Sequence, residues 1–230
     1  MKQIELVIFD MAGTTVRDDD TVNICLREAL AAGQVTVTRD EVNLVMGFPK
    51  PIAIQLILER KLGQATDAAI KSIHEDFLWR MIHFYRTDER IEPMPHTVAT
   101  MIKLKDAGVK VALDTGFSRP IVNAILARLG WDDVDLLDAT VASDEVAQGR
   151  PHPDMVFRAM ELTGVKDVAA VAKVGDTPSD LLEGTAAGCG LVIGVLNGTH
   201  TREQLAGHPH THLIGSLAEL PAVVLGNGKG

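Results

Sequence analysis

The sequence predicts an α/β protein in which a Rossmann-like parallel sheet forms the core and a smaller helical domain is inserted into it. Apolar runs of strand length alternate with helical patterns after residue 91, whereas residues 17–90 contain helical patterns and no convincing strand. One more strand, 4–10, precedes the helical stretch and must pair with strands that follow it. We therefore expect a core domain over 1–16 and 91–230 and a helical domain, the helical insert, over 17–90.

Composition limits the kinds of partner. The chain has 230 residues, of which 46% are apolar and 23% charged, as in ordinary soluble proteins. The net charge is −9 and no basic stripe is present, so we expect no nucleic-acid partner. No apolar run approaches the roughly 20 residues that span a bilayer, and no export signal is visible. The two cysteines, Cys25 and Cys189, are far apart in sequence, and we expect a reduced, cytoplasmic protein without a membrane partner.

The first strand carries the most informative residues. Its apolar run ends on Asp10, which places a carboxylate at the carboxyl end of the sheet, where open α/β proteins bind ligands. Gly13 lets the backbone turn sharply and approach a ligand closely, and Thr14 adds a hydroxyl beside it.

Four helices are predicted in the helical insert, over residues 22–32, 38–45, 52–62 and 66–85. The polar run Asp18–Asp20 before them is expected to be a solvated hinge. Gly47, Pro49 and Pro51 interrupt the pattern between the second and third helices. These breakers predict a stiff loop that contains Lys50.

The rest of the core is predicted to alternate between strands and helices. Helices are expected within 93–108, 118–130, 152–164 and 181–188, and strands within 109–116, 136–142, 168–180 and 190–198. The histidine run at 208–212 is expected to lie in a loop without a metal, and the glycine-rich end, 226–230, to be a frayed tail.

Polar groups follow several of the predicted strands. Asp10, Thr115 and the pair Asp176 and Asp180 would meet at one edge of the sheet, with Arg150 in a nearby loop. Clustered carboxylates repel one another unless a cation neutralises them, and oxygen ligands suit Mg²⁺. A carboxylate can also attack phosphorus and form an aspartyl-phosphate, while a hydroxyl and an arginine hold the phosphoryl oxygens. The sequence therefore indicates magnesium-dependent phosphoryl chemistry.

Four motifs together resemble those of the haloacid dehalogenase superfamily: DMAGTT at 10–15, Thr115, Arg150 before a proline, and VGDTPSD at 174–180. The helical insert stands where that superfamily places a mobile helical cap. The resemblance implies Asp10 as the nucleophile, and a Mg²⁺ site formed by Asp10, the backbone carbonyl of Ala12, Asp176 and Asp180. It also implies a phosphate-binding set that consists of Ala12, Gly13, Thr14, Thr115, Gly116 and Arg150.

One position departs from most phosphatases of the superfamily. They carry a second aspartate two residues after the nucleophile, where this chain has Ala12, and a methyl group cannot transfer a proton. Alanine at this position is typical of the phosphonoacetaldehyde hydrolase, or phosphonatase, branch. That branch forms a Schiff base between its substrate aldehyde and a lysine in an MGxxK stretch. The stretch MGFPK in this chain makes Lys50 the matching residue.

Two residues depart from the phosphonatase pattern. Ala53 stands where that branch has a histidine, and Phe117 replaces a tyrosine. The leading interpretation is a hydrolase that cleaves a small phosphonate of the phosphonoacetaldehyde type. A phosphatase that acts on a small phosphate ester and a phosphoryl-binding protein without turnover remain as alternatives. A homodimer through the helices of the insert is a further expectation from the resemblance.

Overall fold

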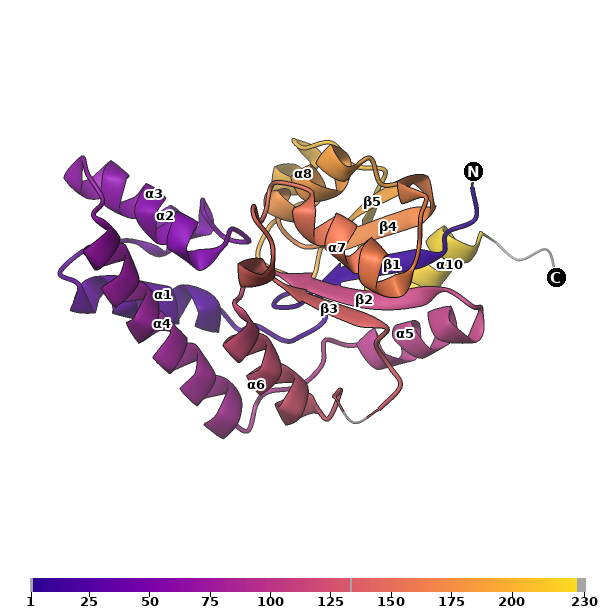
Figure 1. Ribbon diagram of the computed structural model, residues 1–230, viewed down its shortest axis with the longest axis horizontal. Coiled ribbons are helices and arrows are strands. Elements are labelled where there is room, and N and C mark those ends of the chain that lie inside the picture. Colours follow the sequence, from indigo (N-terminus) through magenta and orange to yellow (C-terminus); the bar gives the residue numbers. More distant parts are fainter. Residues whose placement is uncertain (1, 133, 227–230) are drawn as a thin grey trace.

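The computed structural model describes residues 2–132 and 134–226. A parallel sheet with its covering helices forms one part, and four helices of the helical insert form the other (Figure 1). These four helices are α1 (Thr21–Ala32), α2 (Arg39–Asn43), α3 (Lys50–Leu62) and α4 (Asp67–Thr87). The chain leaves the sheet after its first strand and returns to it only after α4.

The sheet has six strands. They are β1 (Leu6–Asp10), β2 (Lys110–Thr115), β3 (Ala139–Ala142), β4 (Val171–Gly175), β5 (Leu191–Val195) and β6 (His212–Ile214). Their order is β3-β2-β1-β4-β5-β6, and every neighbouring pair is parallel. The prediction that the first strand pairs with strands after the insert is confirmed, because β1 lies between β2 and β4. Asp10 stands directly beside Asp114 in the register of β1 and β2.

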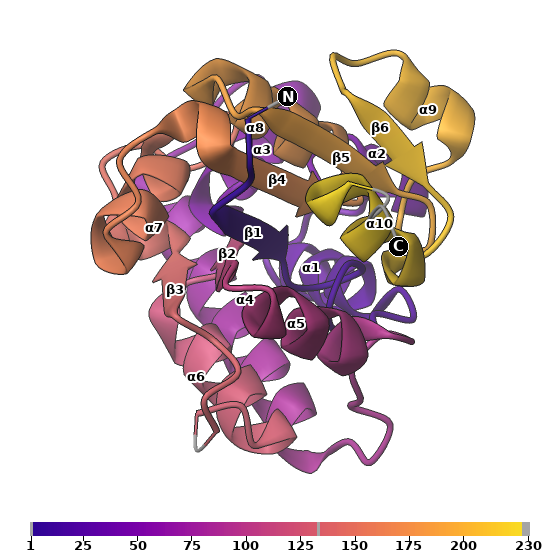
Figure 2. The ribbon, with the colours of Figure 1, turned by 90° about the vertical axis from the view of Figure 1, so that its right-hand side faces the viewer.

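Helices cover both faces of the sheet (Figure 2). They are α5 (Thr97–Asp106), α6 (Arg119–Leu129), α7 (Asp154–Thr163), α8 (Pro178–Ala187), α9 (Arg202–Ala206) and α10 (Leu220–Leu225), with 3₁₀ turns η1 (Ser143–Glu145), η2 (Val168–Ala170) and η3 (Leu217–Glu219). Successive strand residues point to opposite faces. Leu6 and Ile8 of β1 therefore pack with α7, whereas Val7 and Phe9 pack in the cluster that contains α5 and α6.

The helical insert shares an apolar core with the face of the sheet that α5 and α6 cover. Tyr85 of α4 meets Phe117 of the core edge to face, with ring centroids 6.3 Å apart. Where the chain leaves and re-enters the core, Val16 and Pro93 form an antiparallel bridge. The domain boundaries at residues 17 and 90 remain our prediction.

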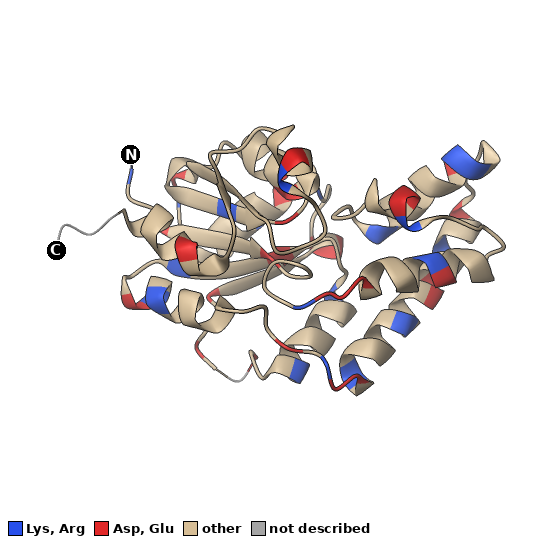
Figure 3. Cartoon of the chain, turned by 180° about the vertical axis from the view of Figure 1, so that it is seen from behind, with Lys and Arg blue, Asp and Glu red and all other residues tan. Residues whose placement is uncertain are grey.

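Charges of both signs are interspersed over the helices (Figure 3). Within the described residues, no helix has the length and apolar character needed to cross a membrane.

Three local predictions differ from the structure, two of them at prolines. Lys50 was expected in a loop but is the first residue of α3, and α8 begins at Pro178 rather than at residue 181. Proline fits the first turn of a helix, because the amide hydrogens there have no partner within the helix. His212 was expected in a loop and lies in β6, a strand of only three residues at the edge of the sheet. The predicted tail at 226–230 lies outside the described residues except for Gly226.

Candidate active site

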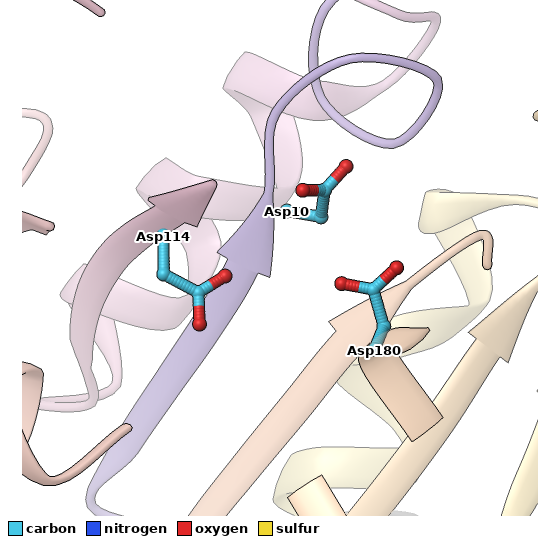
Figure 4. Close-up of side chains that lie close together, drawn as sticks. All are labelled: Asp10, Asp114 and Asp180. Atoms are coloured by element: carbon cyan, nitrogen blue, oxygen red, sulfur yellow. The ribbon is translucent and has the colours of Figure 1, made fainter. Parts of the chain in front are cut away.

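Carboxylates gather at the carboxyl ends of the central strands (Figure 4). Asp10 is the last residue of β1, Asp114 is near the end of β2, and Asp180 lies in the first turn of α8 after β4. Their oxygens lie within 4.8 Å of one another, a spacing that a metal ion could use. All three are buried, so the negative charge must be balanced locally.

Arg150 supplies one of the balancing charges. Its Nη1 atom lies 2.6 Å from Asp10 Oδ1 and 2.8 Å from Asp180 Oδ1. Its Nη2 atom donates to the side chain of Asp114, and its Nε donates to Glu183 Oε2 at 2.9 Å. The guanidinium is 2% exposed and its pKa is held well above the usual value by these carboxylates, against the opposing effect of burial. Arg150 therefore fixes the position of the Asp10 carboxylate.

Lys173 supplies the second charge from inside the sheet. This residue of β4 is fully buried; its Nζ bonds the Asp114 carboxylate and lies 3.2 Å from both Asp180 Oδ1 and Glu183 Oε2. Sequence analysis missed both Lys173 and Glu183. The available signals were a lysine within an otherwise apolar strand and a glutamate in a helix of small residues. We call Asp114, Arg150, Lys173, Asp180 and Glu183 the ionic cluster.

Asp176 stands apart from the ionic cluster. Its Oδ1 accepts the Thr14 hydroxyl at 2.9 Å, and its Oδ2 accepts the Thr199 amide at 2.7 Å. Burial, and then repulsion from Asp10 and Asp180, raises its pKa to about 7. Burial likewise raises the pKa of Asp10 to about 6, although Arg150 opposes the change. Buried negative charge around Asp10 and Asp176 is thus incompletely compensated by the protein, and a divalent cation fits this donor set.

The loop after β2 contains Thr115 and Gly116. The Thr115 hydroxyl accepts the amide of Phe117 at 3.2 Å. Gly116 lies under the backbone of the insert: a Cβ atom there would stand 2.7 Å from the carbonyl oxygen of Gly47. Gly47 is equally confined, since its own Cβ would meet Thr177 Oγ1 at 2.5 Å. The loop before α3 therefore packs directly on the core at two glycines.

Lys50 extends from the start of α3 toward Asp10. Its side chain is buried, and its Nζ donates to the Phe48 carbonyl at 3.4 Å. Burial lowers the pKa of the amine to about 8. Ala53, three residues after Lys50, is also buried. A lysine with a lowered pKa in such a place can act as a nucleophile.

A central cavity lies between the insert and the core. The space in it that is open to the centre of a water molecule is about 20 Å³, enough for one or two waters. Its walls are formed by Asp10, Ala12, Asp18, Val22, Met46, Gly47, Lys50, Thr115, Gly116, Phe117, Arg150, Thr177 and Thr199. A phosphoryl group with an organic part needs more room than this.

The structure brings most of the predicted site residues to this cavity. Five of them line it together with Asp10: Ala12, Lys50, Thr115, Gly116 and Arg150. The others lie beside it: Thr14 bonds Asp176, Gly13 is packed against the same carboxylate, and Asp180 belongs to the ionic cluster.

Asp18 corrects one expectation. The sequence placed it in a solvated run, yet it is half-buried and lines the central cavity. No pattern in the sequence distinguishes it from Asp19 and Asp20. Its neighbour Asp19 is exposed, as expected for the whole run.

Comparisons with known proteins identify relatives of this chain. A family model described as haloacid dehalogenase-like hydrolase matches residues 4–188. The chain is 33% identical over 210 residues to phosphonoacetaldehyde hydrolase of Lysinibacillus sphaericus (strain C3-41), which covers 84% of this chain and 76% of that protein. It is 32% identical over 202 residues to a bifunctional phosphonoacetaldehyde hydrolase/aminoethylphosphonate transaminase of Clostridioides difficile (strain 630), covering 81% of this chain. The matched region is 31% of that longer protein.

The solved structure of a phosphonoacetaldehyde hydrolase-like protein from Oleispira antarctica has the same fold. The TM-score is 0.85, at 22% identity, and the match covers 97% of this chain and 92% of that one.

Proposed function

We propose that this chain, which belongs to the haloacid dehalogenase-like hydrolase family, cleaves the carbon–phosphorus bond of a small phosphonate aldehyde of the phosphonoacetaldehyde type. One observation carries the proposal: the buried amine of Lys50 and the carboxylate of Asp10 line the same cavity, beside Ala12. The first two groups supply an amine for the aldehyde and a nucleophile for phosphorus. Ala12 leaves no carboxylic acid at the position where ester hydrolysis would use one.

In the proposed reaction, Asp10 attacks phosphorus after Lys50 has condensed with the aldehyde. The iminium formed at Lys50 accepts the electron pair of the breaking carbon–phosphorus bond. Arg150 holds the attacking carboxylate through its 2.6 Å contact with Asp10 Oδ1. Thr115 and the backbone around Gly13, Thr14 and Gly116 would bind the phosphoryl oxygens, since small residues and hydroxyls allow the closest approach.

The residues proposed to hold Mg²⁺ are Asp10, Ala12 through its carbonyl, and Asp176. Bound there, the ion would neutralise charge on the phosphoryl oxygens. Asp180 supports this site indirectly, because its Oδ1 faces Arg150 and its Oδ2 accepts the Thr177 hydroxyl at 2.7 Å. The raised pKa values of Asp10 and Asp176 support the assignment. Each shows that the charged carboxylate is destabilised by its surroundings, and a bound cation would stabilise it.

Trapping with borohydride tests the proposal. The chain is incubated with phosphonoacetaldehyde, Mg²⁺ and sodium borohydride; we expect a reduced adduct on Lys50 and loss of activity. Without borohydride we expect release of inorganic phosphate. In Lys50→Met we expect neither the reduced adduct nor the release of phosphate. Lys61→Met, a change at a lysine on the opposite end of α3, is the matched control and should behave as the wild type. The absence of both adduct and phosphate release would overturn the proposal.

A phosphatase that acts on a small phosphate ester is the second candidate. The observation in its favour is that Ala53 and Phe117 lack the polar groups of the phosphonatase pattern, and both are buried. A panel of sugar, acyl and aryl phosphates separates the two functions: turnover on the panel, with none on the phosphonate, would establish the phosphatase. Tight Mg²⁺-dependent binding of phosphate analogues without turnover of any substrate would instead indicate a phosphoryl-binding protein.

A further inference from the structure

The central cavity is lined by a second carboxylate, besides that of Asp10, for which the proposed reaction has so far no use. Among the described residues that line the cavity, Asp18 and Asp10 are the two acidic ones. The Lys50 amine lines the same cavity as both carboxylates. Asp18 comes from the segment that joins β1 to α1.

The chemistry at Lys50 needs a group that carries protons. Condensation of an ammonium with an aldehyde gives an iminium and one water molecule. Two protons must pass from nitrogen to the aldehyde oxygen. Ala12 cannot carry them, and the amine itself is bonded only to the Phe48 carbonyl among the described residues, which cannot accept a proton for transfer. A carboxylate that lines the same cavity can do so, directly or through one water molecule.

Asp18 has the surroundings that such a carrier requires. Its Oδ1 accepts the backbone amide of Val22 at 3.1 Å, which holds the carboxylate in one orientation at the start of α1. Burial raises its pKa, which eases protonation. Four charged or titratable groups interact electrostatically with Asp18. They are Lys50 from α3, Asp20 from its own segment, Cys25 from α1, and Tyr85 from α4. Lys50 is the cation among them.

We propose that Asp18 carries protons between Lys50 Nζ and the aldehyde oxygen of the substrate. This rests on the proposed function, because it assigns a residue to the Schiff-base step. The Asp18 carboxylate takes a proton from the ammonium, and the nitrogen lone pair then attacks the carbonyl carbon. The carbonyl π electrons move to oxygen, which takes that proton and becomes a hydroxyl.

The second transfer completes the condensation. Asp18 removes a further proton from nitrogen and delivers it to the hydroxyl. The carbon–oxygen bond breaks, water leaves, and the nitrogen lone pair forms the carbon–nitrogen double bond of an iminium that keeps one hydrogen on nitrogen. Asp18 ends as the carboxylate, so atoms and charge balance without another reactant.

Two other roles compete with this one. Asp18 could serve only to accept the Val22 amide at the start of α1. Alternatively, His74 of α4 could carry the protons, since it lines a second cavity that Lys50 also borders and its pKa is lowered by burial and by Lys50. Asp144, across that cavity, opposes the shift at His74. His74 does not line the central cavity, which favours Asp18.

The test compares Asp18→Asn with Asp19→Asn and His74→Asn. Asparagine keeps an oxygen that can accept the Val22 amide but cannot carry a proton. We expect Asp18→Asn to slow both the trapping of phosphonoacetaldehyde on Lys50 and the release of phosphate by about 10²–10⁴-fold. Asp19 is exposed and bonds Arg17, so Asp19→Asn should match the wild type, as should His74→Asn. The thermal unfolding midpoints of all three should stay close to that of the wild type.

A rescue experiment separates proton transfer from structure. In Asp18→Ala the space of the carboxylate is vacated, and added formate should restore the trapping rate in a concentration-dependent way. If the wild type still forms its adduct, any one of three results would overturn the assignment. These are wild-type rates in Asp18→Asn, slow trapping in His74→Asn alone, and no response of Asp18→Ala to formate. A wild type that forms no adduct would overturn the proposed function, and this assignment with it.

Discussion

The Nζ atom of Lys50 lies 5.5 Å from the centroid of the Phe117 ring, and the ring of Phe77 lies 6.0 Å away on the side of the insert. Aromatic faces attract a cation but cannot hold it as a close carboxylate would. No carboxylate forms an ion pair with Lys50 within the part of the chain that the structure describes. Burial therefore dominates, and the pKa of the amine falls to about 8.

Trapping of the aldehyde on Lys50 should depend on pH. Below about pH 8 the amine is mostly protonated and must first give a proton to Asp18 before its lone pair can attack, so the rate should rise with pH and level off above that value. The measurement is the single-turnover rate of borohydride trapping between pH 6 and about pH 10, followed by mass spectrometry. A rate that keeps rising toward the ordinary lysine pKa of 10.5 would contradict the burial of this amine.

Lys50→Met should be more stable than the wild type near neutral pH, because it removes a buried charge that lacks a close partner. The folded pKa of Lys50, about 8, lies below the ordinary lysine value of 10.5, so the unfolded state binds more protons between these values. Wild-type stability should therefore rise relative to the variant across that range, by roughly 3 kcal/mol. Chemical denaturation at pH 7 and at about pH 10 measures the change. A stability difference that is the same at both pH values would refute it.

Mg²⁺ should stabilise the protein more at pH 8 than at pH 5. The folded pKa values of Asp10 and Asp176, about 6 and about 7, exceed the ordinary aspartate value of 3.8. Without the ion, the stability that protonation supplies is fully present below pH 3.8 and is lost as pH rises through 6 and 7. Mg²⁺ competes with those protons, so its effect on the melting temperature should grow over the same range. Asp176→Asn should weaken it, and NaCl of equal ionic strength is the control.

Gly47→Ala should impair turnover by keeping the insert from seating on the core. An added Cβ would meet Thr177 Oγ1 at 2.5 Å. Gly63 is the matched control, since it shares a positive φ (+72° against +85°) but has no atom within 4 Å of such a Cβ. Both variants suffer the backbone strain of a side chain at positive φ, whereas only Gly47→Ala has the clash. Steady-state kinetics should show a lower kcat/KM for Gly47→Ala alone; equal losses would indicate that strain, not seating, is responsible.

Lys173→Met should destabilise the fold by about 3–5 kcal/mol, the usual consequence of leaving buried carboxylates without their cation. Glu183, which lies 3.2 Å from Lys173 Nζ, already has a pKa raised to about 8, chiefly by burial. The double variant Lys173→Met, Glu183→Gln removes the carboxyl group that faces Lys173, and it should recover part of the loss above about pH 8, where Glu183 is charged. Urea denaturation of both variants measures this coupling, and additive losses would contradict it.

The sequence predicted those site residues that are marked by their position along the chain. Asp10 and Thr115 end strands and Asp176 follows one, and the geometry of parallel strands brings such residues to one edge. Lys173 could not be found in this way, because its partner Asp114 is 59 residues away and no spacing connects them. Asp18 could not be distinguished from Asp19 and Asp20, since only the packing of α1 and α3 against the core decides which of the three reaches the cavity.

The same limit applies to the fold. The alternation of elements predicts the sheet and its interrupted first connection, because buried strands and amphipathic helices have different periods. It does not predict β6, where three residues are too few to establish a period. At α3 the prolines were interpreted as interruptions, and α8 was expected to begin three residues after Pro178, although proline fits the first turn of a helix.

The first and last described segments, at Lys2 and Gly226, lie on the side of the core away from the helical insert (Figure 1). Residues Lys2 to Ile4 border the same surface hollow as Val223 to Gly226, so the first and last described segments are neighbours. Neighbouring segments of this kind make a protein suitable for circular permutation. A linker that joined these two segments would lie on the side of the core away from the helical insert.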